Sequence, residues 1–275
     1  PKPVVELWFQ RRWRRWWRRR WWRRLLVVTR FMTGPSATPR RPLPGRTVAT
    51  YLIWIAAGAA VLFLALTIVV LTNIDNPAGA DLRVTESFFT AGIDHPWLFS
   101  LAEFLTWFGG IRNIAFIAVA VLVLAYTRAW PWAVFFLALS AGSIALGNLV
   151  KFSVGRERPP WVTHEAPQQT LSFPSGHTLT GITVWCAAAL IGWYLLPPTI
   201  APWLCSTFLV IGLLQGPARM ILGKHWSTDA LGALLLGSAC LLIAWAVFLI
   251  WRHRKFATTS ARGAYDGSPH VAHPH

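Results

Sequence analysis

Six long apolar stretches constrain this chain more than any other feature. Each is close to the ~20 residues that an α-helix needs to cross the hydrocarbon core of a membrane. They lie at about 51–72, 111–127, 131–150, 178–195, 199–216 and 228–251. Backbone N–H and C=O groups in lipid must pair within their own segment, so the stretches are predicted to be helices. The sequence therefore predicts an all-α fold: a polytopic membrane helix bundle with about six transmembrane helices.

Composition divides the chain into three parts. Residues 1–50 hold 14 of the 26 Lys and Arg residues but only one acid, Glu6, and residues 11–24 consist of Arg and Trp alone. This basic, Pro-containing leader is expected to be disordered or to lie on anionic headgroups; a segment translated from a misassigned start is an open alternative. Residues 51–252 are the expected membrane domain, and 253–275 a disordered cytoplasmic tail. Because the positive charge sits in a leader beside an apolar body, no nucleic-acid partner is expected.

The basic flanks predict an orientation. The leader and the cluster from Arg252 to Lys255 are the densest basic flanks, and an even number of spans places both on the cytoplasmic side of the plasma membrane by the positive-inside rule. The connections at 151–177 and 217–227 then face outside. The half-apolar segment 84–110 is expected to cap the bundle or lie on its surface.

The first of three polar segments is KFSVGRERP, at residues 151–159. Arg binds phosphate oxygens bidentately, and Lys adds a compact point charge. Lys151 and Arg158 are therefore candidate phosphate-binding residues. Arg156 and Glu157 are expected at most to tune the choice of substrate. Taken alone, a Lys and an Arg beside a span are equally typical of headgroup anchors.

The second segment, PSGH at residues 174–177, lies where the fourth apolar stretch begins. Ser175 is a good N-cap, and Gly176 lets a ligand approach the backbone. The unpaired N–H groups of a helix start attract anions, and His177 would point at the same anion. The four residues alone describe a capped helix with a solvated histidine equally well.

The third segment, RMILGKHWSTD at residues 219–229, adds the cation Arg219 and a His–Asp pair. His225 and Asp229 are four residues apart and share one face of a helix. The carboxylate can accept from one ring nitrogen, which leaves the other free to act as a nucleophile. A purely structural ion pair is the alternative. The nearby Trp161 and Trp226 are expected in the aromatic belt at the membrane interface.

Together the three segments resemble the signature of the type 2 phosphatidic acid phosphatase superfamily of lipid phosphate phosphatases, K-x6-R-P, P-S-G-H and S-R-x5-H-x3-D. The first two segments match fully, and the third matches at Arg219, His225 and Asp229. One position departs, because Ala218 stands where the pattern has Ser. The resemblance covers roughly residues 50–252.

The resemblance implies roles for these residues. His225 would attack phosphorus and form a phosphohistidine, Asp229 would orient its ring, and His177 would protonate the leaving group and later activate water. No metal and no cofactor are implied. The phosphoryl oxygens would be held by Lys151, Arg158, Arg219 and the backbone of Ser175 and Gly176.

The expected function is hydrolysis of a lipid phosphate or an isoprenoid diphosphate, such as undecaprenyl diphosphate, at the outer membrane face. The expected partners are this substrate and membrane lipids, and the oligomeric state stays open. Two alternatives remain: a phosphotransferase using the same site, and a non-catalytic membrane protein that binds or transports lipid. A transporter would be expected to carry polar residues midway through its spans, and these spans carry almost none. A separate membrane-active role of the leader is a third hypothesis.

Overall fold

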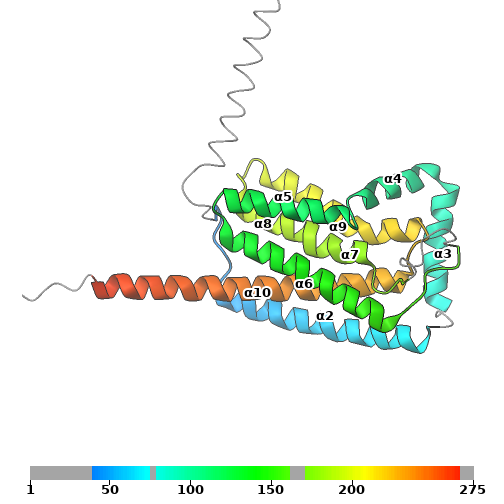
Figure 1. Cartoon of the computed structure of the whole chain (residues 1–275), viewed down its shortest axis with the longest axis horizontal. Helices are drawn as coiled ribbons and strands as arrows, with labels where there is room; N and C mark the ends of the chain where they lie inside the picture. Colours follow the sequence, from blue (N-terminus) through cyan, green and yellow to red (C-terminus); the bar gives the residue numbers. More distant parts are fainter. Residues whose placement is uncertain (1–38, 75–78, 162–170, 267–275) are drawn as a thin grey trace, which may run out of the picture.

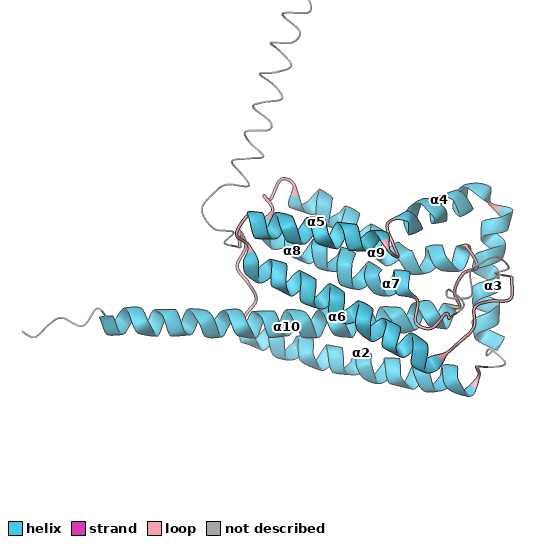
Figure 2. Cartoon of the chain, viewed as in Figure 1, coloured by secondary structure: helices cyan, strands magenta, loops and turns pink. Residues whose placement is uncertain are grey.

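The computed structural model describes residues 39–74, 79–161 and 171–266, with side chains up to residue 255. These residues form helices and no β-strand (Figure 2); an isolated bridge joins Glu157 and Leu171. The all-α fold class is therefore confirmed. The expected leader lies mostly outside the described residues, as does the end of the expected tail, 267–275.

Five helical segments are long and apolar enough to cross a membrane. A sixth helix, α5 (Arg112–Tyr126), is apolar but has 15 residues. It occupies the position predicted for the second span, so the bundle of about six membrane helices is confirmed. The five are α2 (Arg46–Thr72), α6 (Trp130–Val154), the segment Gly176–Leu195, α9 (Ala201–Ile221) and the part Ser227–Lys255 of α10 (Ser227–Asp266).

The helices lie roughly side by side (Figure 1). Helix α10 packs along α2, and α6 and the segment Gly176–Leu195 lie above this pair in the view. Helix α10 has 40 residues, which at ~1.5 Å per residue is about twice the thickness of a hydrocarbon core. It continues past residue 252, where the membrane domain was expected to end, and extends beyond the bundle.

The segment Gly176–Leu195 is the most buried of the five spans. It consists of α7 (Gly176–Thr180), the π-helix η2 (Gly181–Cys186) and α8 (Ala187–Leu195), and all six residues of η2 are buried. A hydroxyl pair joins it to α6, with Ser143 Oγ donating to Thr183 Oγ1 at 2.9 Å. π-helical turns often occur at functional sites, and this one begins at Gly181, four residues after His177 of the PSGH segment.

Two short helices cap one end of the bundle. These are α3 (Gly79–Asp94) and α4 (Pro96–Trp107), and neither is long enough to span a membrane. Helix α4 packs on the end of α9, where Ala102, Ala218, Ile221 and Leu222 form an apolar cluster. The expectation that 84–110 caps the bundle agrees with this arrangement.

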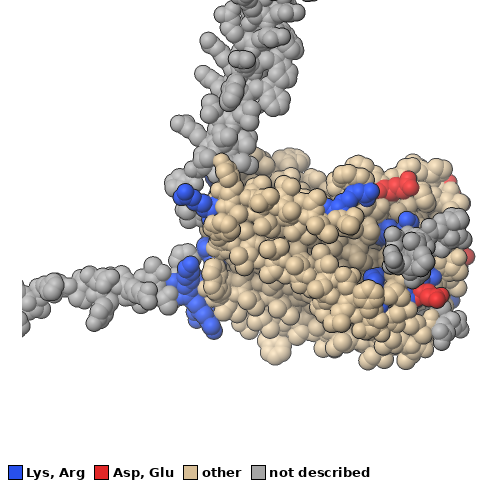
Figure 3. Space-filling model, viewed as in Figure 1, with Lys and Arg blue, Asp and Glu red and all other residues tan. Residues whose placement is uncertain are grey.

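Charged residues gather at the two ends of the molecule, and the surface between them is largely uncharged (Figure 3). Large apolar side chains are exposed along this middle zone, among them Leu64 on α2 and Leu213 on α9. The chain is thus a membrane protein. We call the end that carries the three polar segments the motif end. The opposite end, the basic end, carries Arg40, Arg41, Arg46, Arg128, Arg254 and Lys255 (left in Figure 1).

Candidate active site

All three polar segments meet at the motif end. Helix α6 ends there at Val154, and Gly155 follows with φ 68°, a left-handed conformation that suits glycine and turns the chain. Helices α7 and α10 begin at this end, and α9 ends there. The helix termini therefore bring together side chains that are up to 78 positions apart in the sequence, from Lys151 to Asp229.

His225 and Asp229 form the buried centre of the site. Nδ1 of His225 lies 3.2 Å from Oδ2 of Asp229, and the two side chains are 2% and 0% exposed. The same Oδ2 accepts the backbone N–H of Trp226 at 2.9 Å. With Nδ1–H donating to the carboxylate, the tautomer is fixed and Nε2 keeps its lone pair. The predicted contact is present, but His225 precedes α10, which begins at Ser227, so the two residues do not share a helix face as expected.

His225 is surrounded by positive charge. Its pKa is lowered well below the usual 6.5, first by burial and then by the cations Arg219, Arg158 and Lys151. Both causes disfavour the imidazolium form. The ring is therefore held neutral, which is the form that can attack an electrophile.

Asp229 uses its second oxygen to bind Arg156. Arg156 Nη1 donates to Asp229 Oδ1 at 2.9 Å, and the guanidinium lies over the ring of Trp226, 5.0 Å from its centroid. Arg156 Nη2 donates in turn to Asp81 Oδ2 at 2.6 Å. Arg156 is 3% exposed and Asp81 5%. A buried chain of carboxylate, guanidinium, carboxylate and imidazole thus runs from α3 to His225.

Asp81 also fastens α3 to the start of α10. Its Oδ1 accepts from Ser227 Oγ at 2.6 Å and from the backbone N–H of Thr228 at 3.0 Å, and its Oδ2 accepts from Thr228 Oγ1 at 2.6 Å. Burial raises the pKa of Asp81, but the hydrogen bonds from Arg156, Ser227 and Thr228 outweigh it and lower the pKa below 3.8. Asp81 is therefore ionised at neutral pH.

The PSGH segment is joined to the His–Asp pair through the backbone. The N–H of Ser175 donates to the carbonyl of Asp229 at 3.1 Å. Ser175 Oγ caps α7, accepting from Thr178 Oγ1 at 3.1 Å and from Thr178 N at 3.5 Å. The Ser175 N–H is therefore already used and does not face a phosphate. The backbone donors that a phosphate could meet at this helix start begin with the N–H of the next residue, the exposed Gly176.

His177 rests against two glycines between α4 and α5. A Cβ at Gly109 would collide with the imidazole, and one at Gly110 would lie 3.1 Å from its Cε1 and 3.2 Å from its Nε2. Gly110 has φ 63°, which other residues rarely adopt. The glycines therefore form a close-fitting wall that places this half-buried ring beside the cations of the site.

The predicted cations are held in place by backbone carbonyls. Lys151 Nζ donates to the carbonyls of Leu171 at 3.0 Å and Ser172 at 3.2 Å, which uses two of its three N–H bonds. Arg158 Nη1 donates to the carbonyl of Lys224 at 2.9 Å. Arg219 is 7% exposed in the last turn of α9. All three act electrostatically on His225, so the structure brings together the predicted set.

Two expectations from the sequence are corrected here. Arg156 is a buried partner of Asp229, whereas its position in the motif suggested at most an effect on substrate choice. Trp226 is 5% exposed and its Nε1 donates to the carbonyl of Glu157 at 2.9 Å. Trp161 packs beside it with a ring separation of 6.1 Å and donates to the carbonyl of Gly223. Both rings support the site rather than an interfacial belt.

Asp81 is the residue that sequence reasoning missed. Its signal was weak, because a single acid just before a half-apolar segment resembles an ordinary helix start. Ala218, where the family pattern has Ser, packs in the apolar cluster between α4 and α9, so a methyl group fits the environment at this position.

No group of three His, Cys, Asp or Glu side chains suited to a metal ion occurs among the described residues. The two carboxylates that approach each other, Asp81 and Asp229, are bridged by Arg156. A single guanidinium therefore lies between them and offsets part of their charge.

Buried in a membrane bundle, this constellation of a neutral histidine, its carboxylate and surrounding cations is suited to phosphoryl transfer. Residues 130–253 match the family model of the PAP2 superfamily, and this range contains all three motifs. This match agrees with the predicted family and with the predicted enzyme class, a phosphatase.

One solved structure with a similar fold is described as the first transmembrane PAP2 type phosphatidylglycerolphosphate phosphatase from Bacillus subtilis. It matches with a TM-score of 0.54 and 22% sequence identity, covering 70% of this chain and 94% of that chain. At this identity the likeness concerns the fold. No curated protein sequence matches this chain significantly.

Proposed function

We propose that this protein hydrolyses a lipid phosphate or an isoprenoid diphosphate through a phosphohistidine, without a metal ion. The observation that carries the proposal is the buried His225, whose Nδ1 is held by Asp229 at 3.2 Å and whose neutral form is favoured by burial and three cations. An imidazole in this state is a nucleophile with its free nitrogen directed away from its orienting group.

In the first step, Nε2 of His225 attacks phosphorus. The N–P bond forms as the P–O bond to the leaving group breaks, and the electron pair goes to the leaving oxygen. A protonated His177 donates its proton to that oxygen. Asp229 stabilises the positive charge that develops on the His225 ring, and Arg156 keeps the carboxylate in position.

In the second step, water attacks the phosphohistidine. His177, now neutral, accepts a proton from the water as the new P–O bond forms, and the electron pair of the N–P bond returns to Nε2 of His225. Positive groups facing the three equatorial oxygens stabilise the charge in both transition states. The proposed set is Lys151, Arg158, Arg219 and the N–H of Gly176; the N–H of Ser175, also expected to take part, is bonded to the carbonyl of Asp229.

The proposed setting is the outer face of the plasma membrane, with both termini in the cytoplasm. Its support is that the cations of the basic end flank the helices outside the candidate active site, and the positive-inside rule assigns such flanking cations to the cytoplasm. The motif end then faces outside. The substrate candidates are phosphatidic acid, phosphatidylglycerol phosphate and undecaprenyl diphosphate; the second is the substrate named for the structural neighbour.

The proposal is tested by measuring phosphate release from these three lipids by purified full-length protein in detergent with EDTA present. We expect phosphate release that persists in EDTA and is absent from a His225→Ala preparation. The lipid that is hydrolysed fastest then defines the substrate class. Phosphate transfer to an added alcohol or sugar without release to water would instead establish a transferase. Loss of release on adding EDTA, restored by a divalent metal, would overturn the mechanism.

Replacing Asp229 by asparagine is expected to lower kcat by about 10³–10⁴-fold with little change in KM, because an amide favours the wrong histidine tautomer. The measurement is steady-state phosphate release from a water-soluble short-chain substrate. A kcat within a few-fold of that of the parent protein would show that the His225–Asp229 pair only supports the structure.

The lowered pKa of His225 also predicts a pH dependence of stability. Below pH 6.5 the unfolded chain binds a proton at this histidine, whereas the folded protein does not, so stability falls as the pH falls. Between pH 7.5 and 5.5 this residue is expected to account for a loss of about 1.4 kcal/mol. The melting temperature in detergent should therefore fall more steeply with acidification for the parent protein than for His225→Gln. Equal slopes would mean that His225 keeps an ordinary pKa.

A further inference from the structure

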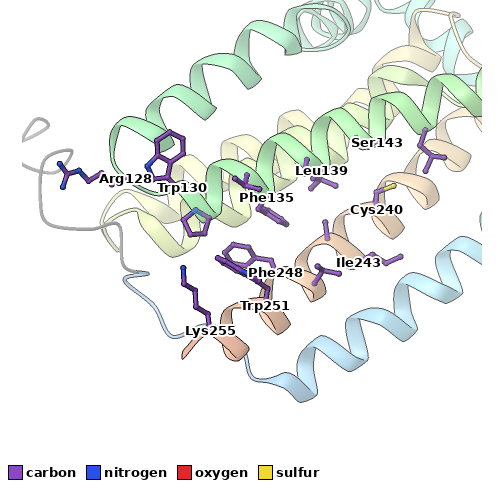
Figure 4. A pocket seen from close by; sticks show the side chains of 17 residues that line it. Arg128, Trp130, Phe135, Leu139, Ser143, Cys240, Ile243, Phe248, Trp251 and Lys255 are labelled. Carbon is purple, nitrogen blue, oxygen red and sulfur yellow. The ribbon is translucent and has the colours of Figure 1, made fainter. Parts of the chain in front are cut away.

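A groove between α6 and α10 lies apart from the catalytic residues. Its volume is about 830 Å³, within the ~300–1,000 Å³ of sites that hold small molecules. It begins at Arg128 and Lys255 at the basic end and runs between the two helices to Ser143 and Cys240 (Figure 4). None of the active-site residues lines it.

Small side chains create the groove. Helix α6 presents Ala138, Gly142 and Ser143, and α10 presents Cys240 and Ala244. A Cβ added at Gly142 would meet no atom within 4 Å. The space is therefore open to the membrane and can accept a flexible apolar chain.

The mouth of the groove is positively charged. Arg128 and Lys255 are both exposed, and no Asp or Glu occurs among the residues that line the cavity. Lys255 Nζ lies 5.5 Å from the ring centroid of Trp251. Trp130 and Trp251 are 59% and 42% exposed at the same end, where exposed tryptophans mark the level of lipid headgroups.

The length of the groove matches an acyl chain. Cys240 and Lys255 are 15 positions apart on α10, which corresponds to about 22 Å along the helix. One leaflet contributes about 15 Å of hydrocarbon. A chain whose headgroup lies at Lys255 therefore reaches past the midplane inside the groove.

We propose that this groove binds an anionic phospholipid of the leaflet opposite the active site. The phosphate of the lipid contacts Arg128 and Lys255, and one acyl chain lies between α6 and α10. Because two cations face the headgroup, an anionic lipid is favoured over a zwitterionic one. The site depends on the membrane fold and not on the proposed reaction.

The test is native mass spectrometry of the full-length protein after delipidation and incubation with dioleoyl phosphatidylserine or dioleoyl phosphatidylcholine. Neither lipid is a phosphomonoester or a diphosphate, so neither is a candidate substrate. The parent protein is expected to retain phosphatidylserine at least tenfold better than phosphatidylcholine. The double variant Arg128→Gln/Lys255→Gln should lose this preference, whereas Arg254→Gln, a nearby cation that does not line the groove, should keep it.

Filling the groove supplies an independent measurement. Gly142→Leu should reduce retention of both lipids at least fivefold, because the new side chain occupies the path of the acyl chain. Gly58→Leu on α2, where a Cβ also meets no atom within 4 Å, is the matched control and should retain lipid as the parent protein does. Equal retention of the two lipids by the parent protein would overturn the proposal. Unchanged retention of both lipids in Gly142→Leu would also overturn it. The same holds if Arg158→Gln, and not the double variant, loses the preference for phosphatidylserine.

Discussion

Replacing His225 by alanine is expected to reduce phosphate release by about 10⁴-fold or more, because the variant lacks the atom that forms the bond to phosphorus. The environment of the site makes this loss hard to compensate. Asp229 and His177 remain, but Asp229 is held by Arg156 at 2.9 Å and His177 is assigned to the leaving group, so neither is expected to replace the attacking imidazole. The measurement is single-turnover phosphate release at saturating substrate, which detects slow residual chemistry.

Two controls separate chemistry from folding in this experiment. His225→Asn keeps much of the buried volume and should be equally inactive. His253→Ala makes the same substitution at the basic end, where the ring contacts the carbonyl of Pro44 at 2.9 Å, and should retain normal release. Turnover by a well-folded His225→Ala protein within about tenfold of that of the parent protein would remove histidine from the nucleophile role.

Replacing Arg156 by methionine is the second change with a large expected effect. The guanidinium is bonded to Asp81 at 2.6 Å and to Asp229 at 2.9 Å, so its loss leaves two buried carboxylates facing each other. Removing one partner of a buried ion pair typically destabilises a protein by about 3–5 kcal/mol. We also expect a loss of kcat of at least about 100-fold, because Asp229 becomes free to take a proton or to rotate away from His225.

A second substitution, Asp81→Asn, tests the same network, because its effect on stability should have opposite signs in the parent protein and in Arg156→Met. Asp81→Asn alone should destabilise the protein, since it removes a charge from a satisfied network. In the Arg156→Met background the same change should stabilise, because it removes one of two unbalanced carboxylates. Thermal melting of the four proteins in detergent measures this coupling. If Asp81→Asn lowers the melting temperature equally in both backgrounds, the network is not held by charge balance.

The membrane architecture could be predicted almost entirely from the sequence. Each apolar stretch satisfies its backbone hydrogen bonds within itself, so local composition is enough to assign helices. The predicted spans agree with the observed helices to within several residues, and α5 is the one that falls short of a full span. Helix termini were less predictable: α10 continues to Asp266, past the boundary drawn at residue 252 from composition.

The central residues of the site were predictable for a similar reason. His225 and Asp229 are four positions apart at the start of α10, so their contact is set by the local chain geometry. Lys151, Arg158 and Arg219 were identified from their motif spacing, and the even number of predicted spans placed all three segments on one side. The catalytic and binding roles of these residues remain the proposals that the experiments above test.

The sequence by itself determined the class of fold, the likeness to the PAP2 superfamily and the residues nearest to His225, because these depend on composition, helical periodicity and short motifs. Tertiary structure alone decided that Asp81 on a capping helix binds Arg156, that Gly109 and Gly110 form the wall behind His177, and that α6 and α10 leave a groove between them. Such contacts join residues as much as 147 positions apart, from Asp81 to Thr228. Their geometry depends on how whole helices pack, which no local pattern encodes.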